Sequence, residues 1–299
     1  MRIRVHSALF TVALLFSANY VVSKLGMREF SPMAFAWTRI AGAALTLAVL
    51  APGEAPLDRE DPRRVAGFAI LGVVINAPLF LLGLSLTSVH VAAILITTIP
   101  VFTLAAAIVL GRERRSATRI GGIALACAGA LMVVGGESLA GTWRSVLGAM
   151  LIVINCLSYA LYLVISKPSM ARLSPLRVVA QMFGVGALVL LPFAALPLAR
   201  QDWQSLSAGA WLALALVIIG PTIVAYLLQA WALRHADSSL VATYTYVQPV
   251  LATFLGAMFL GETIHPIVIV AAVVIFFGVW LAARTLPTST PSSAVGGTM

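Results

Sequence analysis

Residues 65–111 read VAGFAILGVVINAPLFLLGLSLTSVHVAAILITTIPVFTLAAAIVLG and contain no Asp, Glu, Lys or Arg. A helix needs about 20 mostly apolar residues to cross the hydrocarbon core of a bilayer, so this stretch is long enough for two crossings. The break Thr87-Ser88-Val89-His90 divides it into spans at 65–86 and 89–111. A chain of nine spans, in which this break does not separate two helices, is the alternative.

The rest of the chain has the same character. Hydrophobic residues make up 61% and charged residues 10%, with a mean hydropathy of +1.03, whereas about 25% of a soluble domain is charged. The fold class predicted is an all-α polytopic membrane protein with ten transmembrane helices. The spans are predicted near 7–25, 32–51, 65–86, 89–111, 119–136, 145–166, 174–198, 209–233, 239–261 and 265–284.

The first apolar run could also be interpreted as a cleaved signal, because Arg2 and Arg4 precede it and Ser17-Ala18 offers small residues for cleavage. The run continues through Val22, however, and it has a counterpart later in the chain. Both features favour a transmembrane helix that is kept.

Basic residues fall mostly on one side of the predicted spans. With the N-terminus inside, 14 of the 19 Lys and Arg residues lie in cytoplasmic segments and four lie on the other side, while Arg39 lies within a span. Short loops rich in Lys and Arg stay in the cytoplasm. The sequence therefore predicts a multi-pass protein of a bacterial-type inner (plasma) membrane with both termini cytoplasmic. The net charge of +9 is spread over these loops, so no nucleic-acid partner is predicted.

The chain also aligns with itself in two blocks. A shift of 143 pairs Ser23-Lys24 with Ser166-Lys167 and Ser31-Pro32 with Ser174-Pro175, and a shift of 149 pairs Pro100 with Pro249, Glu113 with Glu262 and Gly129 with Gly278. The unit contains five spans, an odd number, so the second copy must enter the membrane from the opposite side. Such inverted repeats are typical of secondary transporters, in which two related halves rock about a central site.

Each half carries a similar order of motifs. Gly83-Leu84 leads through Pro100 to Gly111-Arg112-Glu113, and Ala232-Leu233 leads through Pro249 to Gly261-Glu262. This order resembles the EamA repeat of the drug/metabolite transporter superfamily over nearly the whole chain. Ser31-Pro32 followed by Arg39 also matches that pattern.

The resemblance implies a transporter that exports amino acids, other metabolites or drugs, and the YddG-like aromatic amino-acid exporters are one branch that fits. It also implies the domain organisation. Residues 1–140 are predicted to form the first five-helix repeat and residues 141–285 the second, inverted repeat. Residues 286–299, rich in Pro, Ser and Thr, are predicted to be a disordered tail.

Polar residues deep in spans should face the protein interior or a water-filled cavity, because polar groups facing lipid are costly. Two such stripes occur, and the shift of 143 superimposes them. The first contains Asn19, Tyr20 and Ser23, and the second contains Asn155, Tyr159 and Tyr162. We therefore predict that these six residues bind substrate, although the same residue types also join helices by hydrogen bonds.

Four further residues complete the predicted substrate site: Trp37, Arg39, Asn76 and Tyr246. Arg39 could bind a substrate carboxylate, or it could extend along the helix to the outer surface. Further polar groups on other spans are individually weak candidates: Gln181, Tyr226, Gln229, Tyr244 and Gln248. Tyrosine near a span end can instead be an interfacial anchor.

A membrane-embedded enzyme acting on a lipid-linked substrate is the alternative function. Such an enzyme needs clustered carboxylates, His or Cys, whereas all ten acidic residues lie in predicted connections or at span ends. No metal or cofactor is therefore predicted. The expected partners are a small-molecule substrate and the lipid bilayer.

Overall fold

The computed structural model describes residues 2–50, 61–112, 116–140, 143–236, 238–262 and 266–283, and every regular element among them is a helix. The predicted tail, 286–299, lies outside the described residues. The elements in order are α1 (Arg2–Gly26), α2 (Pro32–Leu50), α3 (Asp61–Ala69), η1 (Ile70–Ile75), α4 (Asn76–Leu86), α5 (Val89–Ile96), α6 (Ile99–Val109), α7 (Ala117–Ala140), α8 (Trp143–Arg172), α9 (Pro175–Arg200), α10 (Ala208–Val217), η2 (Ile218–Val224), α11 (Ala225–His235), α12 (Ser238–Thr243), η3 (Tyr244–Tyr246), α13 (Val247–Leu260) and α14 (Pro266–Ala283).

Eight helical stretches among the described residues are long and apolar enough to cross a membrane. They are Ile3–Gly26, Pro32–Leu50, Pro62–Leu86, Val89–Val109, Trp143–Arg172, Pro175–Arg200, Ala208–His235 and Ser238–Leu260. Shorter apolar segments, Ile120–Met132 and Ile269–Gly278, lie within α7 and α14. The chain is therefore a multi-pass membrane protein.

The break predicted after residue 86 separates two helices. Thr87 has an extended backbone, with φ −129° and ψ 179°, and Ser88 is extended too, with ψ 160°. Extended residues cannot continue the helical hydrogen-bond ladder. The alternative in which 65–86 and 89–111 form one helix is thus wrong.

The same element order occurs twice along the described chain. The segment α3-η1-α4 in the first half corresponds to α10-η2-α11 in the second. Both contain a π-helical turn at matching positions, because the shift of 149 carries Ile70–Ile75 onto 219–224 and η2 covers Ile218–Val224. π-Helical turns are rare and concentrate at functional sites.

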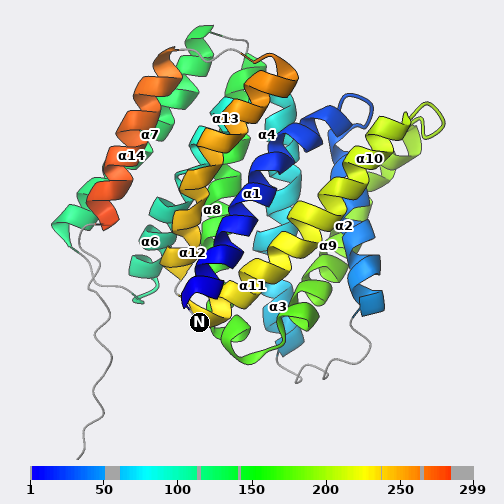
Figure 1. Cartoon of the computed structure of the whole chain (residues 1–299), viewed down its shortest axis with the longest axis horizontal. Coiled ribbons are helices and arrows are strands. Elements are labelled where there is room, and N and C mark those ends of the chain that lie inside the picture. The colour runs from blue at the N-terminus through cyan, green and yellow to red at the C-terminus, as the bar shows by residue number, and fades with distance from the viewer. Residues whose placement is uncertain are drawn as a thin grey trace, which may run out of the picture.

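Side-chain contacts place the end of α8 beside the start of α1. At one end of the bundle, His6 near the start of α1 contacts Tyr244, and Lys167 near the end of α8 donates to the carbonyl oxygen of Ala236 at 2.6 Å. Residues 236 and 244 flank α12, so α8 ends where α1 begins. In Figure 1, the bundle places α1 between the α7–α14 pair on one side and α2, α9 and α10 on the other.

The α7–α14 pair repeats one contact in both directions. A Cβ atom built at Gly129 would lie 3.0 Å from the backbone nitrogen of Ile275, and one built at Gly278 would lie 2.5 Å from that of Ala126. The shift of 149 relates Gly129 to Gly278 and Ala126 to Ile275. Small residues thus let the two backbones approach closely, as is common between membrane helices.

Candidate functional site

A cavity lies inside the bundle between helices of both halves. The empty space at this site, space open to solvent included, is about 500 Å³, and the centres of water molecules can occupy about 60 Å³. The lining residues are Phe16, Asn19, Tyr20, Arg39, Asn76, Ala77, Phe80, Ile96, Ile99, Asn155, Tyr159, Tyr226, Thr245 and Gln248. At about 10–15 Å³ per water, this narrow space holds a few water molecules, so side chains must separate to admit a metabolite.

The stripe on α1 supplies two lining residues and one supporting residue. Asn19 and Tyr20 face the cavity, and the Tyr20 hydroxyl donates to Gln248 Oε1 of α13 at 3.1 Å. Ser23 is fully buried outside the cavity and donates to Asn19 Oδ1 at 3.0 Å. Ser23 therefore orients the Asn19 amide from one turn further along the helix.

The stripe on α8 also contains both residues that line the cavity and a residue that lies outside its lining. Asn155 and Tyr159 line the cavity. The Asn155 amide donates to the carbonyl oxygen of Asn76 at 2.8 Å, and the Tyr159 hydroxyl donates to Gln229 Oε1 at 2.7 Å. Tyr162 is buried but turned away from the cavity. A Cβ atom added to Gly72 would lie 2.8 Å from its ring, so Tyr162 packs against η1.

The π-helical turn η1 presents backbone carbonyls to the neighbouring helices. Ser158 of α8 donates to Leu71 O at 2.7 Å. The Tyr226 hydroxyl of α11 lies 2.9 Å from Gly72 O and 3.4 Å from Asn76 Oδ1, and its single proton can serve one of them. A π turn shifts the i−4 pattern and leaves carbonyls for other donors. The bond from Tyr226 to η1 fixes the position of the Tyr226 ring, which forms one side of the cavity.

Arg39 projects into the bundle. Its side chain is 5% exposed, and Nε donates to the hydroxyl of Thr222, in η2, at 3.1 Å. The side chain therefore does not extend along the helix to the surface, which was one of the two possibilities left by the sequence. The helical rise places the backbone of Arg39 about 10 Å along the axis of α2 from the first residue of that helix.

Two further predicted residues lie away from the cavity. The Trp37 indole donates to the carbonyl oxygen of Ala187 in α9 at 2.9 Å. Trp37 is two residues from Arg39, which places it on nearly the opposite face of α2. The Tyr246 ring lies 5.8 Å from that of Phe276 in α14. The cavity thus brings together Asn19, Tyr20, Arg39, Asn76, Asn155 and Tyr159, whereas Ser23, Trp37, Tyr162 and Tyr246 lie outside its lining.

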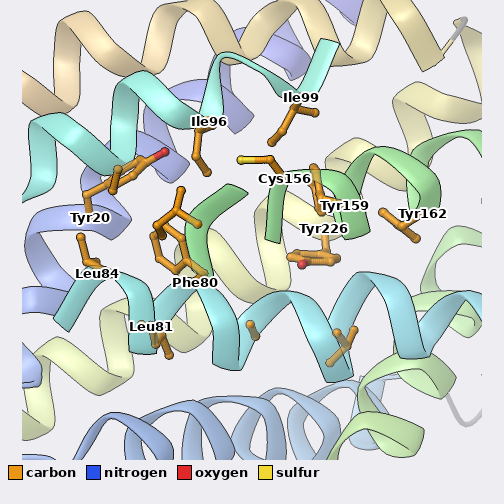
Figure 2. Packing of buried hydrophobic residues seen from close by; sticks show 14 of the residues in the cluster. Tyr20, Phe80, Leu81, Leu84, Ile96, Ile99, Cys156, Tyr159, Tyr162 and Tyr226 are labelled. Atoms are coloured by element: carbon orange, nitrogen blue, oxygen red, sulfur yellow. The ribbon is translucent and has the colours of Figure 1, made fainter. Parts of the chain in front are cut away.

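The predicted set omitted the apolar part of the wall. Phe80, Ile96 and Ile99 line the cavity, and Figure 2 shows Phe80 and Ile96 near Tyr20, with Tyr159 close to Tyr226. Apolar residues in an apolar span carry no signal of the direction they face. Tyr226 and Gln248 did carry a signal, since both are polar and deep in spans.

An ionic cluster closes the end of the bundle where α1 ends. Lys24 Nζ lies 2.6 Å from Glu262 Oε1 and donates to Thr87 O at 2.8 Å. Glu262 Oε2 accepts from the Val89 amide at 2.8 Å and lies 3.3 Å from His90 Nδ1. Partial burial raises the pKa of Glu262, but the hydrogen bonds from His90, Lys24 and Val89 and the charge of Lys24 outweigh it and lower the pKa to about 2.

The second half repeats one bond of this cluster. Lys24 donates to Thr87 O, and Lys167 donates to Ala236 O. The shift of 143 relates the two lysines, and the shift of 149 relates the two carbonyls. Glu113, the counterpart of Glu262, lies outside the described residues.

Comparison with known proteins identifies a family and several relatives. The model of the EamA-like transporter family matches residues 4–135 and 146–284. The chain is 27% identical over 285 residues to the "Uncharacterized inner membrane transporter YedA" of Escherichia coli strain K12, covering 92% of this chain and 89% of that protein. It is 24% identical over 283 residues to a "Probable terminal-alkyne amino-acid exporter" of Streptantibioticus cattleyicolor, covering 93% and 92%.

The fold also has a counterpart among solved structures. One crystal structure superposes with a TM-score of 0.63, covering 96% of this chain and 100% of the other at 20% identity. A likeness at this identity concerns the fold alone. The whole chain therefore has the architecture of an existing structural class.

Proposed function

The chain belongs to the EamA-like transporter family, and from this premise we propose that it exports small metabolites, amino acids among them, across the inner membrane by alternating access. The central cavity carries the proposal, because residues of both halves line it: Asn19, Tyr20 and Asn76 from the first, and Asn155, Tyr159 and Tyr226 from the second. Rocking of one half against the other would change every one of these contacts.

Amino acids are the first substrates to examine. A relative of the chain is named as a probable amino-acid exporter, and the cavity combines amide groups with aromatic rings, which suits a zwitterion with an apolar side chain. The rings of Phe16, Tyr20, Phe80, Tyr159 and Tyr226 favour aromatic substrates, the class exported by the YddG-like branch. The family and its named relatives are transporters, so the enzyme alternative has no support from them.

Reconstitution into liposomes tests the function directly. Purified protein is expected to move at least one labelled amino acid into liposomes preloaded with the same unlabelled compound, whereas protein-free liposomes show no such exchange. A panel of amino acids and of drug-like compounds should be used. Absence of exchange for the whole panel by folded, monodisperse protein would refute the transporter proposal.

We expect Tyr159→Phe to lower the exchange rate about five- to tenfold, because a hydrogen bond contributes about 1 kcal/mol and this change removes the hydroxyl with which a residue of the cavity wall donates to Gln229. Tyr162→Phe is the matched control. It removes a hydroxyl one turn away that lies outside the cavity lining and has no hydrogen-bond partner among the described residues, and should leave exchange near the wild-type rate. Equal rates for the two variants would contradict the assignment of the cavity as the transport site.

We also propose the membrane topology that the sequence predicted: ten spans, in which α7 and α14 cross the membrane like the eight longer helices, and two inverted repeats at 1–140 and 141–285. Both termini are cytoplasmic in this topology. The matched turns η1 and η2 and the reciprocal contact of Gly129 and Gly278 support the repeat. The basic residues support the orientation.

Cysteine labelling tests the orientation. In a background with Cys127 and Cys156 replaced by alanine, Glu137→Cys and Asp202→Cys should react with a membrane-impermeant thiol reagent added to intact cells. Ser116→Cys and Asp58→Cys, the latter outside the described residues, should react only after the membrane is permeabilised. Labelling of Ser116→Cys in intact cells would overturn the proposed orientation.

A further inference from the structure

Arg39 is the one charged side chain among the described residues that line the cavity. No described acidic side chain forms an ion pair with it. Its Nε donates to Thr222 Oγ1, while Nη1 is buried without a hydrogen-bond partner in the described part of the chain. The Thr222 hydroxyl gives its own proton to Val217 O at 2.6 Å, so it serves Arg39 only as an acceptor.

A buried charge without a partner is unfavourable, and in membrane proteins such residues mark ion or substrate pathways. The guanidinium is complementary to a carboxylate, because the two charges are opposite and the planar N–H groups fit the two carboxylate oxygens. Nη1, the guanidinium nitrogen without a hydrogen-bond partner among the described residues, belongs to a side chain that lines the cavity. An anionic group arriving with the substrate would supply the missing partner.

We propose that Arg39 binds the carboxylate of the substrate, so that the cavity selects small monocarboxylates, zwitterionic amino acids included, and rejects organic cations. This inference rests on the proposed function, because it assigns a charge to the substrate of the same cavity. An organic cation would lie beside Arg39 with no described acidic residue in the wall. A second carboxylate would lack a second cation.

The remaining wall suits the rest of such a substrate. The Asn76 side-chain oxygen and the faces of Phe16, Tyr20 and Tyr226 can stabilise an ammonium group by hydrogen bonding and cation–π contact. Phe80 and Ile96 provide an apolar surface for a side chain.

The test uses matched compounds that share a side chain and differ in whether they carry a carboxylate and an ammonium group. The full chain in detergent is titrated with phenylalanine, phenylalaninamide, phenethylamine and 3-phenylpropionate, and with the corresponding leucine series, and its melting temperature is followed. The same compounds then compete against labelled amino-acid exchange in proteoliposomes. We expect the two carboxylates of each series to bind at least about tenfold more tightly than the amide and the amine, a difference of about 1.4 kcal/mol.

Variants then locate the group that recognises the carboxylate. Arg39→Gln should abolish the preference for carboxylates, whereas Arg39→Lys should keep part of it because the charge remains. Arg28→Gln makes the same change of charge near the end of α1, outside the cavity, and should keep the full preference. The ligand-free melting temperature of each variant separates loss of binding from loss of folding.

Each result supports or contradicts the charge assignment or the proposed function. If amides and amines bind or compete as well as carboxylates, or if Arg39→Gln keeps the preference, the charge assignment fails while the transporter proposal stands. If organic cations are exchanged and carboxylates are not, the assignment likewise fails. If no compound of any charge binds or is exchanged, the proposed function itself fails. The comparison of compounds on the unmodified protein holds even if Arg39→Gln does not fold.

Discussion

Gly83→Ala is expected to destabilise the protein by about 1–3 kcal/mol, the usual range for overpacking. Gly83 in α4 faces Gly148 in α8, and a Cβ atom at residue 83 would lie 2.9 Å from the Gly148 carbonyl oxygen and 2.9 Å from side-chain carbons of Ile152. A backbone oxygen cannot move aside without moving α8. Since α4 and α8 carry Asn76 and Asn155, the same substitution should also distort the cavity.

Gly121→Ala in α7 is the matched control, because a Cβ atom there would meet nothing within 4 Å. Alanine also favours the helical backbone over glycine by about 1 kcal/mol. The melting temperature in detergent should therefore fall for Gly83→Ala and stay level or rise for Gly121→Ala. A similar small change in both variants would show that the α4–α8 crossing tolerates additional volume, contrary to the geometry.

The proposed inverted repeat rests on paired landmarks that the sequence already showed. Lys24 and Lys167 make equivalent bonds to Thr87 and Ala236, and Gly129 faces the helix that carries Gly278. These residues are recognisable because charged residues and glycines are uncommon or constrained in membrane helices. The π-helical turn η1 carried no such mark, since Ile70–Ile75 reads as a continuous apolar helix, whereas η2 contains Pro221.

The residues that line the cavity were predicted in part, and helix geometry explains the limit. Tyr159 and Tyr162 lie three residues apart, so their directions differ by about 60° around the helix axis. Residues so related share a broad face, but a narrow cavity reaches only one of them, and the other packs against η1. Which residue faces the cavity depends on how the neighbouring helices pack. The residue pattern of one helix does not specify that packing.

The ionic cluster should make a large contribution to stability at neutral pH. Glu262→Gln removes the charge that pairs with Lys24 and weakens the acceptor for the Val89 amide, and hydrogen bonds to charged groups contribute about 1.5–3 kcal/mol. Both side chains are largely shielded, with 26% of Lys24 and 14% of Glu262 exposed. The melting temperature of the variant should therefore lie clearly below that of the wild type at pH 7.

The pH dependence of this difference provides the sharper test. The pKa of Glu262 is lowered from 4.5 to about 2 in the folded protein, so its stabilising effect is fully present above about pH 4.5 and is lost as the pH falls towards 2. The gap between wild type and Glu262→Gln should thus be widest at neutral pH and narrow between pH 4.5 and 2. Asp202→Asn is the control, because Asp202 is exposed and bonds only within its own turn among the described residues, so its gap should be small throughout. A gap for Glu262→Gln that stays constant down to pH 2 would mean that the carboxylate charge does not hold α1, the α4–α5 junction and the end of α13 together.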